Sequence, residues 1–280
     1  VMIQTILLPV DGSANSGNAL EYGVYIAPKL GASLTGLHVI DVFLIQGPMM
    51  TDITATVGMP PYEGFLEAVE TSLKEKADAI LASFQKRCRA AGVACAAKTN
   101  IGKISDTIIE EAENADLILM AKKGEHFHLK EGGLIGSVAE VVIRKSGKPV
   151  LVTPESYREI ESMGLAYDGS PSAKKALALS LSLSEKAQWP ITVLIVNADA
   201  AKAADLSAQV ENMAERGAAN CEVVVSSGKE AEEILKFIKE GSVELMAMGA
   251  YGHNRLREWL LGSTTSTIIQ KSPVPVLLIR

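Results

Sequence analysis

An α/β protein of two tandem doubly wound domains, each a parallel sheet with helices on both faces, is the architecture that the sequence predicts. Two observations favour it. The 280-residue chain repeats the same blocks of residues in the same order, and within each repeat short runs of Leu, Ile and Val alternate with helical patterns. Near-continuous apolar runs are typical of strands buried on both faces. Right-handed crossovers between such strands place helices on both sides of the sheet.

The repeat is visible in four pairs of blocks whose offset falls along the chain. The pairs are ILLPVDGS and MGLAYDGS (6–13, 163–170) and LTGLHVID and ITVLIVNA (34–41, 191–198) at an offset of 157, DLILMAKKG and ELMAMGAYG (116–124, 244–252) at 128, and KPVLVTP and VPVLLIR (148–154, 274–280) at 126. The falling offset places about 29 extra residues of the first half between its second and fourth strands, and two more inside a glycine-containing loop.

Each half is expected to contribute five strands with helices between them. The expected strands are 5–10, 34–40, 93–97, 116–121 and 149–153 in the first half, and 164–167, 191–196, 221–226, 244–248 and 275–279 in the second. Helical patterns such as SGNALEYGVYIAPKLG (16–31) and KEKADAILASFQKRCRAAG (74–92) each end in a glycine that can cap a helix.

The repeat divides the chain into two expected domains, residues 1–154 and 160–280, joined by a short polar segment. The extra segment of the first half, 42–65, contains several Gly and Pro breaks and three methionines. It fits an apolar flap over a site, a partner-contact surface, or a surface excursion without function.

Composition narrows the class of protein. A hydrophobic fraction of 48% with 21% charged residues supplies apolar material for two packed cores. The net charge of −6 argues against nucleic-acid binding, which depends on Lys and Arg neutralising phosphates. No apolar stretch approaches the roughly 20 residues of a membrane span, and no secretory signal is visible at the start. Three cysteines without CxxC spacing suit reduced thiols, so we expect a cytoplasmic protein.

A glycine-containing loop follows the fourth expected strand of the second half. Gly249 and Gly252 precede nine residues, after which Gly262 stands directly before the hydroxyl-bearing run that starts at Ser263. Glycines let N–H groups approach an anion, and a helix start adds free N–H groups and a positive dipole end. The pattern therefore fits either a loop that binds phosphate or a nucleotide, or a glycine-rich connection between a strand and a helix.

Asp168 directly follows the first strand of the second half, and it belongs to the same expected crevice as the loop. Its carboxylate can accept hydrogen bonds from ribose hydroxyls or an adenine amine, but an Asp in YDGSPS is equally a helix cap or a turn residue. His253, Arg255 and Arg257 could contact phosphate or face solvent. No GxxxxGK[ST] motif occurs in the sequence.

The spacing of Gly249, Gly252, Gly262 and Ser263 resembles the ATP-binding signature of the universal stress proteins, and the Asp-Gly-Ser after each first strand is similar to theirs. The resemblance implies a five-stranded parallel sheet in the order 3-2-1-4-5 in each half. It also implies that ATP binds the second half together with a divalent ion, expected to be Mg²⁺. The cofactor-binding residues that it implies are Asp168 and the backbone of Val196 for adenine and ribose, and Gly249, Gly252, Gly262, Ser263 and Thr264 for the phosphates, with Met248 and Thr265 as further members of the set.

The first half departs from this pattern. Ala121 stands in place of the first glycine, Lys122 and Lys123 follow it, and eleven residues separate Gly124 from Gly136 and Ser137. We therefore expect the first half to bind ATP weakly or not at all. Its weaker set of equivalent residues is Asp11, Val39, Gly124, Gly136 and Ser137.

Two further sites in the first-half loop are open from the residues alone. Lys122 and Lys123, with Gly132 and Gly133, could form a different anion site. The alternating histidines of EHFHLKEGG, at 126 and 128, fit either a metal pair or solvated loop residues; two histidines without a third ligand favour the second, and we expect no metal site. His38, within a strand, is expected to be a core or strand-end residue.

Three functional classes fit the chain. The first is a nucleotide-binding stress-response or signalling module with no catalytic residue and slow ATP hydrolysis at most. The second is an adenine-nucleotide-dependent enzyme of the same superfamily, against which the Asp-Gly-Ser turn counts, because such enzymes carry a dedicated loop there. The third is a scaffold with both sites silent. By analogy with family dimers, we expect the last strands of the halves to pair as an internal pseudo-dimer; a homodimer of chains is a further option.

Overall fold

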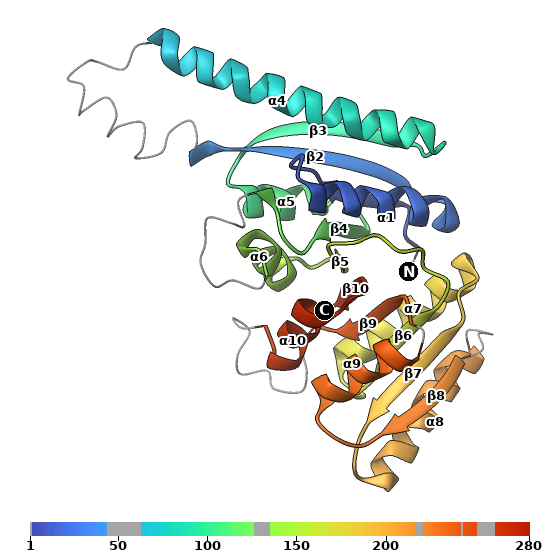
Figure 1. Ribbon diagram of the computed structural model, residues 1–280. Coiled ribbons are helices and arrows are strands. Elements are labelled where there is room, and N and C mark those ends of the chain that lie inside the picture. The colour runs from blue at the N-terminus through green and yellow to red at the C-terminus, as the bar shows by residue number, and fades with distance from the viewer. Residues whose placement is uncertain (1, 44–62, 126–134, 217–220, 242, 251–260) are drawn as a thin grey trace.

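A computed structural model of the chain describes residues 2–43, 63–125, 135–216, 221–241, 243–250 and 261–280 (Figure 1). The first half contains β1 (Thr5–Pro9), α1 (Ala14–Leu30), β2 (Ser33–Asp41), α4 (Glu63–Ala90), β3 (Cys95–Gly102), α5 (Ile104–Ala112), β4 (Leu117–Ala121), α6 (Ser137–Lys145) and β5 (Val150–Thr153). The second half contains β6 (Met163–Ala166), α7 (Pro171–Ala187), β7 (Ile191–Val196), α8 (Ala200–Arg216), β8 (Cys221–Ser226), α9 (Glu230–Glu240), β9 (Leu245–Gly249), α10 (Ser263–Lys271) and β10 (Val276–Ile279).

All ten strands form one sheet in the order β3-β2-β1-β4-β5-β10-β9-β6-β7-β8. Strands are parallel within each half. The two halves meet where β5 pairs antiparallel with β10, with Leu151 opposite Leu277. The α/β fold with two similar domains agrees with the sequence prediction, and the sheet places the first strand of each half between its second and fourth strands.

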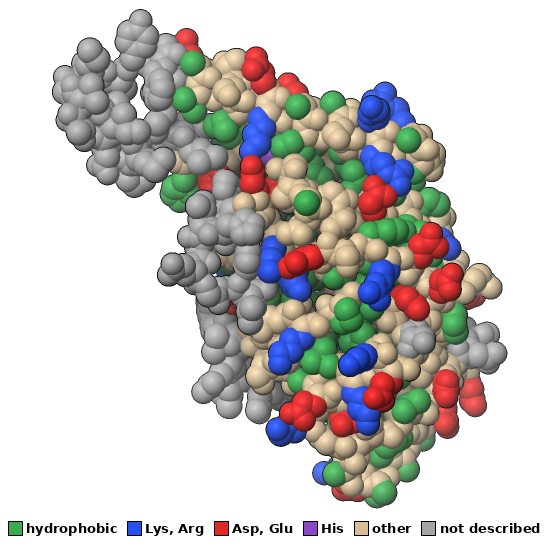
Figure 2. All heavy atoms as spheres, in the orientation of Figure 1, with side chains coloured by type: hydrophobic (Ala, Val, Ile, Leu, Met, Phe, Trp, Pro, Cys, Tyr) green, Lys and Arg blue, Asp and Glu red, His purple; other side chains and the backbone are tan. Residues whose placement is uncertain are grey.

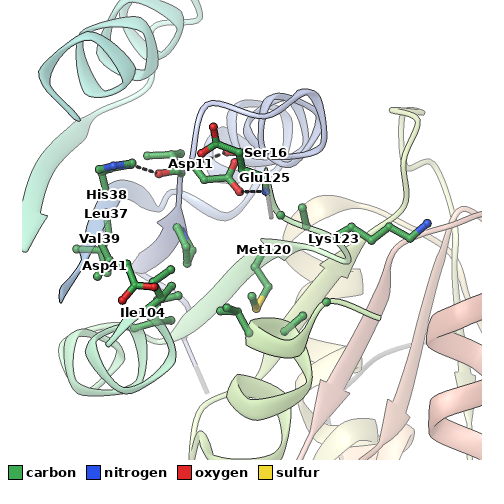
Figure 3. Close-up of a pocket in the computed structure, with 18 of the residues that line it drawn as sticks. Asp11, Ser16, Leu37, His38, Val39, Asp41, Ile104, Met120, Lys123 and Glu125 are labelled. Carbon is green, nitrogen blue, oxygen red and sulfur yellow. Dashed lines mark hydrogen bonds between the residues drawn. The ribbon is translucent and has the colours of Figure 1, made fainter. Parts of the chain in front are cut away.

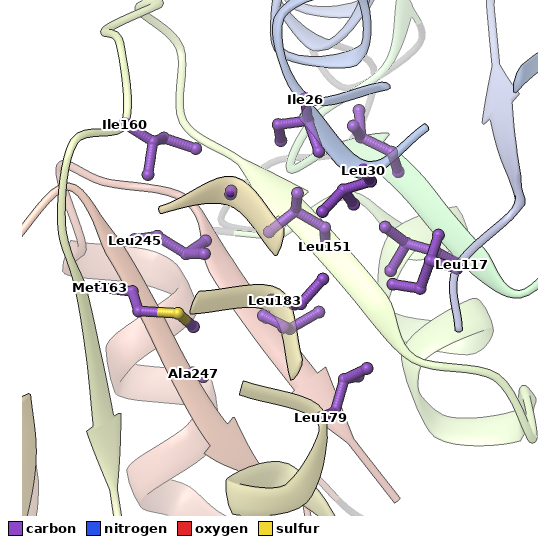
Figure 4. Packing of buried hydrophobic residues seen from close by; sticks show 14 of the residues in the cluster. Ile26, Leu30, Leu117, Leu151, Ile160, Met163, Leu179, Leu183, Leu245 and Ala247 are labelled. Atoms are coloured by element: carbon purple, nitrogen blue, oxygen red, sulfur yellow. The ribbon is translucent and has the colours of Figure 1, made fainter. Parts of the chain in front are cut away.

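Two apolar layers cover the two faces of this sheet, and each layer runs through both halves. One layer lies under α1, α4, α7 and α8, and the other under α5, α6, α9 and α10. At the centre, α1 faces α7, so that Ile26 and Leu30 pack close to Leu151, Leu183 and Leu245 from both halves (Figure 4). The halves therefore share a continuous core.

The joining segment is held against α1 by tyrosines. The Tyr25 hydroxyl donates to the carbonyl of Ile160 at 2.6 Å, and the Arg158 N–H donates to the Tyr22 hydroxyl at 3.1 Å. The Tyr22 and Tyr157 rings meet edge to face at 4.9 Å. Although the segment is mostly polar in sequence, Ile160 is completely buried, so the join packs on the protein instead of spanning open solvent.

The Asp-Gly-Ser turn begins the first helix of each half in the same way. Gly12 and Gly169 adopt positive φ of 82° and 77°, which glycine tolerates without a Cβ penalty. Ser13 then caps α1 by accepting the Ser16 N–H, and Ser170 caps α7 in the same manner. This turn serves local structure in both halves.

The insertion of the first half lies wholly before β3. Cys95 pairs with β2 as Cys221 pairs with β7, which fixes their correspondence at an offset of 126. Residues 44–62 of the predicted 42–65 flap lie outside the described residues, and α4 starts at Glu63, earlier than the helical pattern expected from residue 74. The third strand, expected at 93–97, extends to Gly102.

On the face drawn in Figure 2, acidic and basic side chains are interspersed among apolar ones. None of the described helices combines the length and the apolar character that crossing a membrane requires.

Candidate functional site

In each half, the first strand lies between the second and the fourth, and helices cross to opposite faces of the sheet on either side of it. A crevice forms at the carboxyl ends of such strands, and this is where open α/β sheets bind ligands. The chain therefore has two equivalent candidate sites, one beyond β1, β2 and β4 and the other beyond β6, β7 and β9.

The second-half crevice brings together the residues predicted at its strand ends. Asp168 follows β6, Val196 ends β7 and Gly249 ends β9, and these strands are neighbours in the sheet. The Asp168 side chain is exposed, and its Oδ1 accepts the Ser170 N–H at 2.9 Å. Met248 is buried in the core beside them. Asp168 thus closes the local turn, as one of its two interpretations predicted, and its carboxylate still reaches solvent.

Gly249 has a packing role. A Cβ built on it would lie 2.6 Å from Ser172 Oγ and 2.9 Å from the backbone N of Ala173, at the first turn of α7. These distances are too short for any side chain, so the close approach of β9 to α7 requires glycine. The sequence pattern had suggested room for an anion as the reason for this glycine.

The start of α10 lies close to the same strand ends. Gly262 is its N-cap residue, and among the described residues no side chain caps this helix. A Cβ on Gly262 would meet just one described atom within 4 Å, Thr265 Oγ1 at 3.8 Å. The Ser263 side chain is exposed, whereas Thr264 donates to Glu230 Oε2 at 3.1 Å and the buried Thr265 donates to the Ala250 carbonyl at 3.4 Å.

Part of the predicted second-half loop lies outside the described residues, namely Gly252, His253, Arg255 and Arg257.

A cavity of about 660 Å³ occupies the first-half crevice (Figure 3). All five residues of the weaker predicted set line it, namely Asp11, Val39, Gly124, Gly136 and Ser137. The carboxyl ends of β1, β2 and β4 and the starts of α5 and α6 form its walls. The equivalent residues are therefore brought together in the half that departs from the family pattern.

Asp11 ties the loop to the end of β1. Its Oδ1 accepts the Ser13 N–H at 2.9 Å and its Oδ2 accepts the Glu125 N–H at 2.7 Å. A Cβ on Gly124 would lie 2.8 Å from the same Oδ2. Both carboxylate oxygens are thus engaged by backbone N–H groups, and Gly124 is small because the carboxylate lies against it.

The lysines around this cavity are engaged with other groups. Lys122 is buried, and its Nζ donates to the Gln270 carbonyl at 3.0 Å, at the end of α10 in the other half. Burial lowers the pKa of Lys122 below its usual value. Lys123 extends away from the cavity and pairs with Glu155 at 2.6 Å (Figure 3). The anion site suggested for these lysines would need them to turn inward, and Gly132 and Gly133 lie outside the described residues.

His38 was expected to be a core or strand-end residue, and it is a buried residue of the cavity wall. The side chain is 8% exposed, and its Nδ1 lies 2.7 Å from the Val10 carbonyl. Because a carbonyl accepts, Nδ1 carries the hydrogen, and in the neutral ring Nε2 is an acceptor. The position of His38 three residues before the end of a crevice-forming strand was the available signal.

Apolar residues of the cavity were also missed by the sequence analysis. They are Leu37, Ile104, Ile108, Met120, Ile135 and Val138. They come from β2, β4, α5, α6 and the residue at 135, and which way their side chains point depends on the three-dimensional arrangement.

The histidines at 126 and 128 lie outside the described residues. Within the ranges that the structure describes, no group of three or more His, Cys, Asp or Glu side chains is placed to hold a metal ion.

Comparison with known proteins gives a consistent result. The model of the universal stress protein family matches residues 2–154 and 159–280. Universal stress protein Slr1230 of Synechocystis is 29% identical over 289 residues, covering 99% of this chain and 100% of that protein. Universal stress protein MJ0531 of Methanocaldococcus jannaschii is 32% identical over 160 residues, covering 56% of this chain and 86% of that protein.

Among solved structures, a universal stress protein from Archaeoglobus fulgidus superposes with a TM-score of 0.76 at 26% identity. The superposition covers 99% of this chain and 96% of that one.

Proposed function

The chain belongs to the universal stress protein family, and from this premise we propose that it is an adenine-nucleotide-binding stress-response or signalling module with ATP in the crevice of the second half. The observation that carries the proposal is the start of α10. There a glycine N-cap, whose added Cβ would meet one described atom within 4 Å, precedes an exposed serine, and no described side chain takes up the first N–H groups.

The chemistry of this helix start suits phosphate. The first N–H groups of a helix lack intrahelical partners, and together with the positive end of the dipole they favour an anion. Gly262 leaves room for a phosphate oxygen to approach these groups, and the Ser263 hydroxyl adds a donor. A dipole alone contributes about 0.3–1 kcal/mol, so several backbone donors must act together.

The other end of the crevice suits adenine and ribose. The Asp168 carboxylate is exposed at this end of the crevice, and Val196 and Met248 provide an apolar border at the strand ends. Mg²⁺ would accompany the triphosphate and offset its charge. In this proposal the nucleotide biases the conformation or the partner choice of the module, and hydrolysis is slow at most.

The pairing of β5 with β10 supports a second part of the proposal. We infer that the two halves act as an internal pseudo-dimer, in which one half carries the nucleotide.

Isothermal titration of the full chain with ATP and Mg²⁺ tests the site, using the substitution Gly262→Ser. Serine is a preferred N-cap residue, and its hydroxyl would accept the N–H groups that the phosphate needs. We expect one ATP per unmodified chain, and for the variant an affinity at least tenfold weaker with an unchanged or higher Tm. Gly147→Ser is the matched control, because a Cβ added to Gly147 would have no described atom within 4 Å and this residue lies after α6.

Loss of affinity together with an unchanged or raised Tm would separate ligand approach from misfolding. An affinity that Gly262→Ser leaves unchanged would reject the site, and two ATP per chain of equal affinity would reject the assignment to one half.

A further inference from the structure

The first-half cavity differs from the second-half crevice in the chemistry of its walls. We propose that this cavity is a second ligand site, which binds an uncharged, largely apolar small molecule with one hydrogen-bond donor and does not bind a nucleoside triphosphate. The proposal does not depend on ATP binding in the second half.

The main difference is one pair of facing residues. In the second half, Thr264 at the start of α10 donates to Glu230 at the start of α9, at 3.1 Å. The corresponding residues at an offset of 126 are Val138 of α6 and Ile104 of α5. Both are half-buried, both line the cavity and both pack against the same apolar layer. A polar pair at the starts of α9 and α10 is therefore an apolar pair at the starts of α5 and α6.

The rest of the wall continues this apolar surface. Met120, Ile108 and Ile135 border the cavity together with Leu37 and Val39. A volume of about 660 Å³ falls within the roughly 300–1,000 Å³ of small-molecule sites, which are lined mainly by apolar side chains with a few polar groups.

The charges around the cavity disfavour a polyphosphate. The Nζ atoms of Lys76, Lys122 and Lys123 are bonded respectively to Glu125, to the Gln270 carbonyl and to Glu155. The first turn of α6 carries Glu140, which lines the cavity and has no partner among the described residues.

At the position of Glu140, α10 has Ser266. A phosphate at the start of α6 would therefore meet the Glu140 carboxylate and the Val138 side chain, whereas at the start of α10 it would meet the hydroxyl groups of Ser266 and Thr264, with the Glu230 carboxylate already bonded to Thr264.

His38 supplies the polar group that a mostly apolar ligand needs for orientation. Its Nδ1 is held by the Val10 carbonyl at 2.7 Å, which fixes the ring in the cavity wall. Nε2 has no partner in the described part of the chain, and in the neutral ring it accepts a hydrogen bond. A ligand with one N–H or O–H group on an apolar body matches this acceptor.

The test uses N-phenyl-1-naphthylamine, an uncharged fluorophore with an apolar body and one N–H group. Fluorescence titration of the full chain is expected to show one saturable site, which saturating ATP and Mg²⁺ do not displace. In the double variant Ile104→Glu, Val138→Thr, which introduces the polar pair of the second half, we expect at least tenfold weaker binding. The matched control is Glu230→Ile, Thr264→Val, which makes the reverse exchange and should leave the first-half affinity within twofold.

Several results would overturn the proposal. They are the absence of saturable binding, displacement of the fluorophore by ATP, or an affinity that the Ile104 and Val138 exchange leaves unchanged. The experiment with ATP as competitor uses the unmodified chain, so its result is valid even if a variant fails to fold. Failure here would leave the Gly262→Ser result untouched, so the two proposals are tested separately.

Discussion

Between the second strand and the helix that follows it, the two halves fill the same space with different pairs of residues. In the first half, Phe84 of α4 packs over Gly36 of β2, where a Cβ would lie 2.7 Å from the ring. The corresponding residues of the second half are Val193 and Val210, both fully buried in the same apolar layer. In the first half a single large ring, that of Phe84, fills the space, and in the second half two medium-sized side chains, Val193 and Val210, share it.

The same kind of paired change recurs at the crevices. Val138 and Ile104 replace Thr264 and Glu230 together, and neither half mixes an apolar member with a charged one. Since the residues of a pair touch or face each other, changing one alone leaves a clash, a void or an unpaired charge. The comparison indicates that the halves diverged in compensating pairs, and the following substitutions test this.

The largest expected effect is at the Gly36 and Phe84 pair. Gly36→Val forces a side chain into the Phe84 ring and should lower the free energy of unfolding by about 3 kcal/mol. Phe84→Val alone leaves a cavity and should lower it by about 2 kcal/mol. The double variant recreates the Val193 and Val210 arrangement, and a coupling of about 2 kcal/mol should bring its loss in urea denaturation to about 3 kcal/mol, below the roughly 5 kcal/mol expected if the two losses were additive. Additive effects of the two substitutions would contradict compensation at this pair.

An intermediate effect is expected at the end of the fourth strand, where the halves have Gly249 and Ala121. Gly249→Ala places a Cβ against Ser172 Oγ and the backbone of Ala173, so we expect a loss of roughly 1–3 kcal/mol. The reverse exchange, Ala121→Gly, removes a methyl without a clash and should cost about 0.5–1 kcal/mol. Thermal or urea unfolding without ligand measures both.

If Gly249→Ala left the apo stability unchanged, the packing explanation would be wrong, and room for a ligand would be the remaining reason for this glycine.

These contrasts also show how much of the fold and of the candidate site could be predicted from the sequence. The repeat offsets predicted the strands, because buried parallel strands leave apolar runs that duplication preserves. The five weaker site residues, Asp11 among them, do converge on one cavity, since they follow strand ends that the topology brings together. The roles of Asp11 and Gly124 within the loop were not predictable, because the Glu125 N–H reaches Asp11 across 114 residues.

Other features could not be predicted from the sequence, because they depend on contacts between elements that are distant along the chain. The reason for Gly249 lies in α7, which is remote in sequence, and the apolar wall of the first crevice depends on the starts of two helices, α5 and α6, that both line the cavity. From the spacing alone, Gly249 and Gly262 were interpreted in the same way, as glycines that make room for an anion. The structure separates Gly249, which packing requires, from Gly262, where an added Cβ would meet one described atom within 4 Å.

The smallest expected effect concerns two cations that cross between the halves. Lys122 Nζ donates to the Gln270 carbonyl at the end of α10, and Arg280 Nη1 donates to the Arg144 carbonyl at the end of α6, at 3.2 Å. Gln270 and Arg144 correspond at the offset of 126, so each half supplies a cation to the last turn of the equivalent helix in the other. Lys122 is buried and Arg280 is exposed, which makes the contacts unequal.

Lys122→Met should therefore change the pH dependence of stability more than stability at pH 7. Loss of the hydrogen bond costs about 1 kcal/mol, and removal of a buried charge offsets it, so we expect a net change within about 1 kcal/mol. Because burial lowers the pKa of Lys122 in the folded state, the unfolded chain retains that proton to higher pH. The free energy of unfolding then gains a contribution as pH rises through the lowered pKa toward the usual value of 10.5. Urea denaturation from pH 7 to 10.5 should show this contribution in the unmodified chain and in Arg280→Met, but not in Lys122→Met. Parallel profiles of unfolding free energy against pH for all three proteins would show that the site between the halves does not disfavour the charge of Lys122.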